Sequence, residues 1–526
     1  MELELGKLVP EIIVLVAACA AVLVGLGRSD ATRKLSQVIA AVSLLAGLAV
    51  AVIAEACPGQ YAWAASPRVL GGFFNPSYIT ILAMAIGFLS VLAAWDMPSK
   101  ADPAVTDTRY RGEFFGMMLF SIAGVSMVGK VNDLVWLFVV LELVSIPTYI
   151  LVATGRSQII AQEAGVKYFF LGALSAAIFL FGFSYLYGAT GTTRFFDTVD
   201  AQNHVVHGIT WALAQSPSMS YLALIGLLMV VVGVAYKIAA VPLHFYTPDV
   251  YQGAATPVTA FLAFAPKAAG MVAIIQIVGL TGFDFARMGV QGQAILTLLS
   301  VMAVLTMTVG NVLALLQRNI KRMLAYSSIA HSGYMLVGIV AGKTEYAPAS
   351  NGIRATLFYL GAYSIMNLGA FAVLIYLQGK ADAGEDIDDL AGVSKEHPAA
   401  ALAMAVCLFS LIGMPLTVGF LGKLYIVQAA LSTGHAWLAV IVVLNAAIAA
   451  AYYLRIIAAM YLRDVWNPFT VRNSYPQRVT ALVCTVAVIG LGLMPAALLN
   501  ATATGSSFGP AKAAAPAAVL PAATQR

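Results

Sequence analysis

Four ionisable side chains lie near the middle of apolar stretches that are long enough to cross a lipid bilayer: Glu142, Lys237, Lys267 and Lys423. A charged lysine or carboxylate at the centre of a spanning helix is unfavourable by roughly 2.5–3.5 kcal/mol on insertion scales. Such residues therefore face a protein interior or a wet cavity, where burial disfavours the charged form and brings proton exchange closer to neutral pH. We interpret these four side chains as sites of proton chemistry.

The alternative is that long side chains reach the lipid headgroups from near the ends of helices. This alternative fits poorly for Lys267, which is central in the stretch 258–280, and for Glu142, which is central in 133–153. It fits Lys167 and Arg455 at least as well as a function does, because both lie closer to the ends of their stretches. Structural pairing stays open for these two residues.

The composition places the chain with integral membrane proteins, because 61% of its 526 residues are hydrophobic and only 10% are charged. Apolar windows of about 17–25 residues are long enough to span a bilayer as helices. The sequence therefore predicts an all-α polytopic membrane protein with about fourteen transmembrane helices. The predicted spans are 8–27, 36–56, 78–95, 114–129, 133–153, 161–188, 220–242, 258–280, 294–316, 322–341, 354–378, 400–431, 436–461 and 479–500.

Basic residues collect in alternate loops, as the positive-inside rule requires. This pattern predicts that both termini lie outside and that the basic loops lie in the cytoplasm of a bacterial cell, with the chain in the cytoplasmic (inner) membrane. The net charge of +5 is then explained by topology, and no nucleic-acid partner is expected. The residues of the basic loops are Arg28, Arg33 and Lys34; Lys100, Arg109 and Arg111; Arg318, Lys321 and Arg322; and Arg463, Arg472 and Arg478.

The order of the spans predicts two repeats. Spans four to eight and nine to thirteen each contain five helices, and an odd number of helices inverts a second copy across the membrane. We expect N-terminal accessory helices in 1–110, a first five-helix repeat in 111–285 and a second, inverted repeat in 290–465. The last helix and an alanine- and proline-rich tail, expected to be disordered, occupy 466–526.

Two helix interruptions fall in matching spans of these repeats. Pro242 lies in the seventh span, five residues after Lys237, and Gly413 and Pro415 precede Lys423 in the twelfth. Proline breaks the hydrogen-bond ladder of a helix, and a break at membrane depth is tolerated only where protein or water satisfies the freed groups. Ordinary proline kinks are the alternative, but a lysine beside both breaks favours polar cavities in broken helices 7 and 12.

Motifs for redox, metal or nucleotide chemistry are not apparent in the sequence. The four cysteines, Cys19, Cys57, Cys407 and Cys484, form no CxxC pair, and we interpret them as small buried hydrophobic residues. We therefore expect no cofactor and no metal in this chain. The acidic run with Glu385, Asp386, Asp388 and Asp389 is interpreted as a solvated loop between spans.

Several strings that carry these charges resemble the antiporter-related membrane subunits of proton-pumping NADH:quinone oxidoreductase, respiratory complex I. The resemblance covers about residues 110–460 and is closest to the subunit N branch, because TPDVY (247–251) is followed by TPVTAFLAFAPKAAG (256–270) and the twelfth span carries a lysine rather than a glutamate. Gln252, Ala255 and Met414 depart from the usual pattern but leave the charged positions unchanged. The strings are ELVSIPTYILVA (142–153), EAGVKYFFLGALSAAIFLFGFSYLYGATGT (163–192), PLHFYTPDVYQGAATPVTAFLAFAPKAAG (242–270), QRNIKRMLAYSSIAHSGYMLVG (317–338) and SLIGMPLTVGFLGKLYI (410–426).

The resemblance implies an ion pair between Glu142 and Lys237, with Lys267 as a central relay and Lys423 as the terminal site. His331 is central in the tenth span and is placed to bridge Lys267 to Lys423, since imidazole titrates near neutrality. A hydrogen-bonded packing histidine is the alternative. Tyr326, Ser327 and Ser328 are left without a role, because hydroxyls in membrane helices usually satisfy local groups.

The function expected from this resemblance is that of a proton-translocating subunit of NADH:quinone oxidoreductase, an enzyme whose FMN, iron–sulfur clusters and quinone would be in partner subunits. Its partners would be the other membrane and peripheral subunits of complex I and membrane lipid. Two alternatives share the broken helices and the lysines. These are a cation/proton antiporter subunit and a membrane-arm subunit of an ion-translocating hydrogenase.

Overall fold

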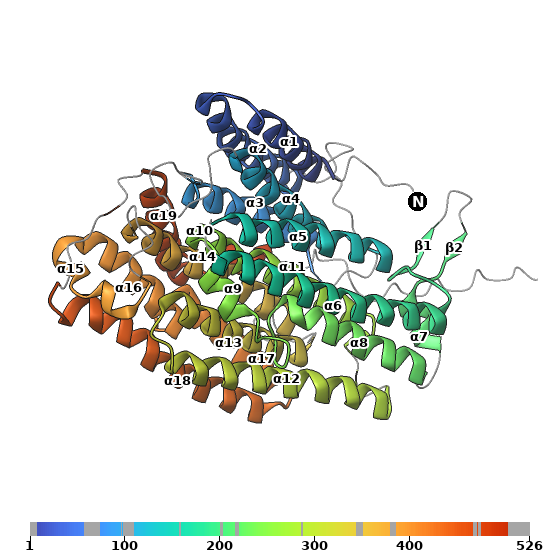
Figure 1. Cartoon of the computed structure of the whole chain (residues 1–526). Helices are drawn as coiled ribbons and strands as arrows, with labels where there is room; N and C mark the ends of the chain where they lie inside the picture. The colour runs from blue at the N-terminus through green and yellow to red at the C-terminus, as the bar shows by residue number, and fades with distance from the viewer. Residues whose placement is uncertain are drawn as a thin grey trace, which may run out of the picture.

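The computed structural model describes residues 8–56, 74–95, 97, 110–156, 159–199, 204–215, 220–283, 285, 288–342, 351–378, 385–465, 471 and 475–502. Within these ranges nearly all of the chain is helical, and the long helices run side by side (Figure 1). The first half contains α1 Val9–Gly25, α2 Asp30–Ala56, α3 Pro76–Ala93, α4 Arg111–Val128, α5 Leu134–Thr154, α6 Ile159–Thr190, α7 Ile209–Gln215 and α8 Tyr221–Lys237.

The chain continues with three helices in close succession, α9 Thr247–Gly253, α10 Thr256–Leu262 and α11 Ala265–Gly279. They are followed by α12 Gly289–Leu315, α13 Ile320–Ala341, α14 Gly352–Leu377, the 3-10 helix η5 Ile387–Leu390, α15 Val393–Glu396, α16 Pro398–Ile412, α17 Val418–Ser432, α18 Ala436–Leu462, α19 Tyr475–Leu493 and α20 Ala496–Ala501.

The fourteen predicted spans are found among the described residues. Eleven helices or helix pairs are long and apolar enough to cross a membrane, and α1, α8, α16 and α17 are shorter apolar helices. The last two form the halves of a single broken span, which confirms the prediction for helix 12. The prediction for helix 7 is confirmed as well, since α8 ends at Lys237 and the chain continues through turns into α9.

One small element was not predicted. Between α6 and α8 the chain forms an antiparallel hairpin of β1 Thr198–Val199 and β2 Val205–Val206, followed by the short helix α7. The strands have only two residues each, too few for an alternation of apolar and polar residues to be detected in the sequence.

Side-chain caps fix the starts of several helices that carry the site. Asp133 accepts hydrogen bonds from the amides of Val135 and Trp136 at the start of α5. Asn319 does the same for Arg322 at the start of α13, and Asn351 for Ile353 and Arg354 at the start of α14. Such caps satisfy amides that have no partner inside the helix.

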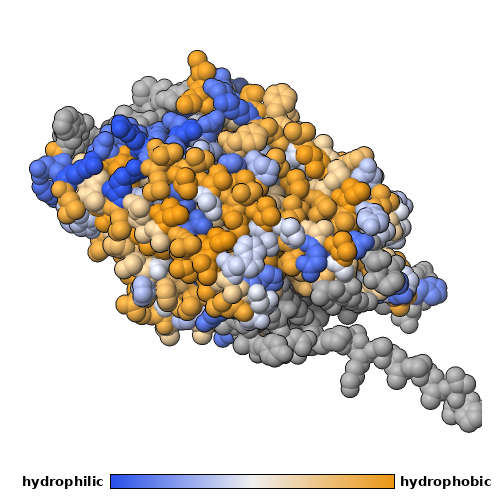
Figure 2. Space-filling view, turned by 90° about the horizontal axis from the view of Figure 1, so that it is seen from below, coloured by the Kyte–Doolittle hydropathy of each residue, from blue (hydrophilic) through white to orange (hydrophobic). Residues whose placement is uncertain are grey.

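Three spans form the centre of the molecule. In the 18-residue apolar window of Thr256–Gly279, all residues are buried. In the corresponding windows of α13 and α14, 94% and 89% of the residues are buried. The peripheral helices α6, α18 and α19 instead expose large apolar side chains, among them Phe170, Leu444 and Leu482. Figure 2 shows hydrophobic residues over the middle of one face, the surface expected of a protein whose solvent is lipid.

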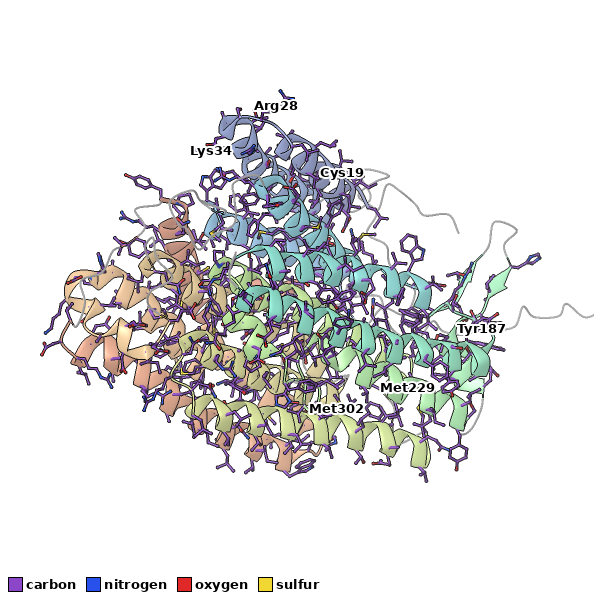
Figure 3. All side chains as sticks on the ribbon, in the orientation of Figure 1. Cys19, Arg28, Lys34, Tyr187, Met229 and Met302 are labelled. Carbon is purple, nitrogen blue, oxygen red and sulfur yellow. The ribbon has the colours of Figure 1, made fainter. Side chains whose placement is uncertain are left out.

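Charged residues lie at the ends of the helix assembly. Arg28 lies in the turn between α1 and α2, and Lys34 lies near the start of α2 (Figure 3). The short helix α15 lies at the opposite end of the molecule from the β1–β2 hairpin (Figure 1). In this multi-pass arrangement, one side of the membrane is predicted to be cytoplasmic. This side contains the C-terminal ends of α5, α9 and α14 and the N-terminal ends of α13 and α16.

The structure can be compared with the predictions for the cysteines, the C-terminal tail and the acidic run. Cys407 and Cys484 are buried as expected, whereas Cys19 is exposed on α1, where the prediction was wrong. Cys57 lies outside the described residues, as does the tail from residue 503. In the acidic run, Asp386, Asp388 and Asp389 are exposed, but Glu385 is largely covered, because two buried basic side chains bind it.

Candidate proton relay site

The structure places Glu142 and Lys237 in direct contact. The ammonium nitrogen of Lys237 lies 2.9 Å from Oε1 of Glu142, and the lysine side chain is 3% exposed while the glutamate side chain is 18% exposed. Lys237 also donates a hydrogen bond to Oγ of Ser145 at 2.5 Å. The buried cation therefore has one charged partner and one neutral partner, both on α5.

The local fold explains why these groups meet. Glu142 and Ser145 are three residues apart on α5 and so lie on one face of that helix. Lys237 is the last residue of α8, and the chain then turns at Ala239, whose φ of 56° is in the left-handed region. Since a cation at the C-terminal end of a helix interacts favourably with the helix dipole, this end stabilises the lysine as well.

Lys267 lies in the first turn of α11 and is buried among neutral groups. Its ammonium group donates to Oγ of Ser328 on α13 at 2.5 Å and to the carbonyl oxygen of the same residue. It also lies 4.6 Å from the ring centroid of Tyr363. In the part of the chain that the structure describes, no carboxylate forms an ion pair with Lys267.

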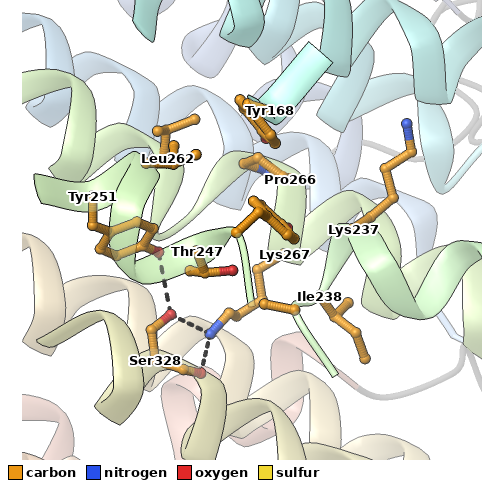
Figure 4. A pocket seen from close by; sticks show the side chains of 12 residues that line it. Tyr168, Lys237, Ile238, Thr247, Tyr251, Leu262, Pro266, Lys267 and Ser328 are labelled. Atoms are coloured by element: carbon orange, nitrogen blue, oxygen red, sulfur yellow. Dashed lines mark hydrogen bonds between the residues drawn. The ribbon is translucent and has the colours of Figure 1, made fainter. Parts of the chain in front are cut away.

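A small pocket lies between the stem of Lys237 and the ammonium group of Lys267. The pocket has a volume of about 20 Å³ in which the centre of a water molecule fits, and it therefore has room for about one water. Thr247, Val250 and Tyr251 of α9 line it, and the hydroxyl of Tyr251 lies 3.2 Å from Oγ of Ser328. The two ammonium groups point in different directions, and Lys267 points toward Ser328 (Figure 4).

Lys423 lies on α17, the second half of broken helix 12, and its side chain contacts the end of the first half, α16. Its ammonium group donates to the carbonyl oxygens of Leu411 and Ile412, both at 2.9 Å, at the end of α16. These carbonyls have no partner within their own helix because the helix ends there. Gly413, with φ of 94°, makes the turn away from α16, a conformation that side chains disfavour.

His331 is fully buried on α13 between hydroxyl groups. Its Nδ1 lies 2.7 Å from the hydroxyl of Tyr359, and its Nε2 lies 3.2 Å from that of Tyr453. It makes no hydrogen bond with Lys267 or Lys423 among the described contacts. Its hydrogen-bond partners in this structure are thus the two tyrosine hydroxyls, and the role of His331 as a relay stays a prediction.

Two tyrosines lie between His331 and the lysines. The ring of Tyr363 is 5.0 Å from the imidazole and 4.6 Å from the ammonium group of Lys267. The ring of Tyr334 is 5.6 Å from the imidazole and 5.0 Å from the ammonium group of Lys423. The order from one lysine to the other is thus Lys267, Tyr363, His331, Tyr334 and Lys423.

Lys167 and Arg455 are both placed in structural contacts. Lys167 forms ion pairs with Glu163 at 2.7 Å and Asp249 at 3.2 Å, and its side chain is 43% exposed. Arg455 donates to the carbonyl oxygen of Leu315 at 3.1 Å and to that of Gln317, at the end of α12. Neither contributes a contact to the buried lysines.

Several residues of the site had no predicted role. Ser145 had a usable signal, because it lies one helical turn from Glu142. The tyrosines 334, 359, 363 and 453 had none, since a buried tyrosine in an apolar span has the pattern of a packing residue. Ser328, which was left without a role, is the hydrogen-bond partner of Lys267.

Comparison with known proteins gives consistent results. Residues 131–449 match the family described as "NADH:quinone oxidoreductase/Mrp antiporter, TM". The chain is 38% identical over 490 residues to NADH-quinone oxidoreductase subunit N of Rhodospirillum rubrum. The aligned residues make up 93% of this chain and 94% of the relative.

Two solved structures have the same fold over almost the whole chain. One is a chain of respiratory complex I from Thermus thermophilus, with a TM-score of 0.73 and 28% identity over 94% of this chain and 100% of that chain. The other is a chain of the Mrp complex from a Dietzia species, with a TM-score of 0.76 over 95% of this chain and 96% of that chain. At 20% identity, the second likeness concerns the fold alone.

Proposed function

The chain belongs to the NADH:quinone oxidoreductase/Mrp antiporter transmembrane family, in the branch of the subunit N proteins, and from this premise we propose that it translocates protons through Glu142, Lys237, Lys267, His331 and Lys423. Translocation is coupled to electron transfer from NADH to quinone in other subunits. In this proposal the flavin, the iron–sulfur clusters and the quinone site belong to those partners.

The observation that carries the proposal is the environment of Lys267. This lysine is 3% exposed, and its ammonium group is bound only by neutral oxygens and an aromatic ring among the described residues. A buried cation without a counter-ion is unfavourable, because burial disfavours the charged form of the side chain. A residue of this kind is suited to take up and release a proton.

The ion pair supplies a control on this exchange. While Glu142 is ionised and in contact, it stabilises the charge of Lys237. If Glu142 moves away or is neutralised, Lys237 loses this stabilisation and passes its proton toward the adjoining pocket, which has room for about one water molecule. The proton then reaches Lys267, and later Lys423 by way of His331, so that the coupled groups titrate together.

The proposal includes an orientation. Both termini face the outside of the bacterial cytoplasmic membrane, and the basic loops face the cytoplasm. The acceptor of the proton released from Lys423 is a neighbouring subunit or the outer surface.

The test is proton pumping by the complete complex in inverted membrane vesicles. Lys237→Ala is expected to reduce NADH-driven acidification strongly while the complex still assembles. The matched control is Lys395→Ala, which removes a lysine whose side chain is 56% exposed and pairs with Asp464. Wild-type pumping by Lys237→Ala would remove this residue from the mechanism.

Purification in mild detergent distinguishes the proposal from the antiporter and hydrogenase alternatives. We expect flavin and iron–sulfur subunits to co-purify with the chain, together with NADH:quinone reductase activity. Recovery with hydrophobic subunits alone, or with a hydrogenase, would contradict the redox-driven pump.

A further inference from the structure

Glu385 lies between two buried basic side chains from different repeats. Its Oε1 is 2.7 Å from Nη2 of Arg156, which follows α5, and 2.7 Å from Nζ of Lys321 on α13. The basic side chains are 4% and 1% exposed, whereas that of Glu385 is 20% exposed. One carboxylate thus neutralises two cations that are largely removed from water.

The backbone around Glu385 is joined to the start of α13. The amide of Ile320 donates to the carbonyl oxygen of Glu385 at 2.7 Å, and the amide of Ile387 donates to that of Arg318 at 3.0 Å. Nδ2 of Asn319 adds a hydrogen bond to Oε2 of Glu385 at 3.2 Å. The segment after α14 therefore fixes the first turn of α13.

The same cations hold the end of α9. Lys321 donates to the carbonyl oxygen of Ala254 at 3.0 Å, and Arg156 reaches that of Gln252 at 3.5 Å. On the other side, Arg322 binds Oδ1 of Asp249 at 2.8 Å. The position of α9 consequently depends on basic side chains from both repeats.

The inner face of α9 belongs to the pocket beside Lys267. Tyr251 of α9 contacts Ser328, and Ser328 accepts a hydrogen bond from Lys267 (Figure 4). Ser328 follows Lys321 by seven residues, two turns along α13, and so lies on the same face of that helix. Both helices that supply this hydrogen-bond chain are therefore tied to Glu385.

We propose that Glu385 is a positioning residue for Lys267, which holds α9 and the start of α13 together so that Tyr251 and Ser328 meet at the buried ammonium group. The role of Lys267 itself rests on the proposed function. Without the carboxylate, Arg156 and Lys321 are neighbouring like charges at a buried site, and their repulsion favours release of α9. Loss of the tie opens the pocket toward the cytoplasmic end.

The test measures the exposure of α9 in the complete complex. Thr247→Cys places a thiol on the pocket wall, in a background with Cys19→Ser and Cys57→Ser, and inverted vesicles present the cytoplasmic face to a membrane-impermeant maleimide. Glu385→Gln should increase the rate at which this introduced thiol is labelled by about tenfold, since breaking a buried ion pair lowers the free energy of local opening. Asp388→Asn is the matched control, because it removes an exposed carboxylate of the same segment.

A second readout separates positioning from general loosening. Cys407 on α16 and Cys484 on α19 are buried on helices other than α9 and α13. They should therefore stay unlabelled in Glu385→Gln. Glu385→Asp keeps the charge and should restore both slow labelling and proton pumping in part. Labelling of these two cysteines together with the introduced thiol, or no rescue by aspartate, would overturn the proposal.

Further outcomes separate this proposal from the function that it rests on. If Glu385→Gln prevents assembly, Arg156→Gln tests the same tie more mildly, and unchanged labelling of the introduced thiol in that variant overturns the proposal. Normal labelling and pumping in Glu385→Gln, with pumping lost in Lys267→Ala, would exclude the positioning role of Glu385 and leave the proposed relay in place. Normal pumping in Lys267→Ala would instead remove the proposed relay.

Discussion

Lys423 donates a hydrogen bond to the carbonyl oxygen of Leu411 at 2.9 Å, so that the lysine of the second broken helix binds the end of the half that precedes its own. In the first broken helix, Lys237 ends its half-helix and pairs with Glu142 on another helix. The two lysines occupy matching breaks, but one interacts with a full negative charge and the other with carbonyl dipoles. We therefore expect substitutions at the two positions to have different consequences.

Replacement of Lys423 tests the closure of helix 12. Lys423→Met removes the ammonium group and leaves the carbonyl oxygens of Leu411 and Ile412 without this donor, at a cost of about 1–3 kcal/mol. We expect a lower thermal midpoint of the purified complex and at least a tenfold loss of proton pumping. Lys423→Arg, which keeps the charge, should retain more stability than Lys423→Met. Unchanged pumping in Lys423→Met would contradict a terminal role.

A double-mutant cycle tests the contact between Glu142 and Lys237. Removal of either partner leaves an uncompensated buried charge or polar group, which destabilises by about 3–5 kcal/mol. The double variant Glu142→Gln/Lys237→Met should be less destabilised than the sum of the single variants, by about 1–3 kcal/mol. Denaturant titration of the isolated complex measures this coupling. Simple additivity would mean that the two groups do not interact in the membrane.

The exposed pair Lys395 and Asp464 provides the control for this cycle. Both side chains are largely in solvent, where screening weakens an ion pair. The corresponding variants should show no measurable coupling.

Gly413 tests whether the shape of the break positions Lys423. An alanine at this φ of 94° is strained, and its Cβ would lie 3.2 Å from Cδ of Lys423. We expect Gly413→Ala to destabilise by about 1–2 kcal/mol and to reduce proton pumping. Gly434 also has a positive φ, of 80°, but a Cβ there meets nothing within 4 Å. Gly434→Ala should therefore lower the thermal midpoint while pumping stays normal, and equal effects on pumping would argue against positioning.

The sequence predicts the helices and their breaks well because both have strong local causes. An apolar stretch of membrane length can satisfy its backbone only as a helix, and proline or glycine beside a lysine marks a place where that helix ends. The side chains of Glu142, Lys237, Lys267 and Lys423 were identified from the cost of burying charge alone. The contact of Glu142 with Lys237 rested on resemblance, since 95 residues separate them.

The partners of the other lysines could not be predicted from the sequence. Lys423 binds backbone carbonyls, which every residue carries, and Lys267 binds a serine 61 positions away on another helix. Glu385 was assigned to a solvated run because its neighbours are acidic and exposed. Its burial arises from Arg156, distant by 229 positions, and from Lys321. Such long-range contacts depend on how helices pack, which local patterns do not specify.

The pH dependence of stability tests the charge state of Glu385. Burial raises the pKa of this carboxyl, but the charges of Lys321 and Arg156 and their hydrogen bonds outweigh burial and lower the pKa below its ordinary value of 4.5. Because the pKa is lower in the folded chain than in the unfolded chain, the stabilisation is complete above the ordinary value and is lost as the pH falls through the lowered one. The thermal midpoint of Glu385→Gln should thus lie below that of the wild type by a constant amount between about pH 6 and about pH 8. That difference should shrink only in more acidic solution, and Asp388→Asn should show a much smaller one at every pH. A difference that already shrinks from pH 8 to pH 6 would mean that the carboxyl takes up a proton near neutrality, and would contradict an ionised carboxylate between Arg156 and Lys321.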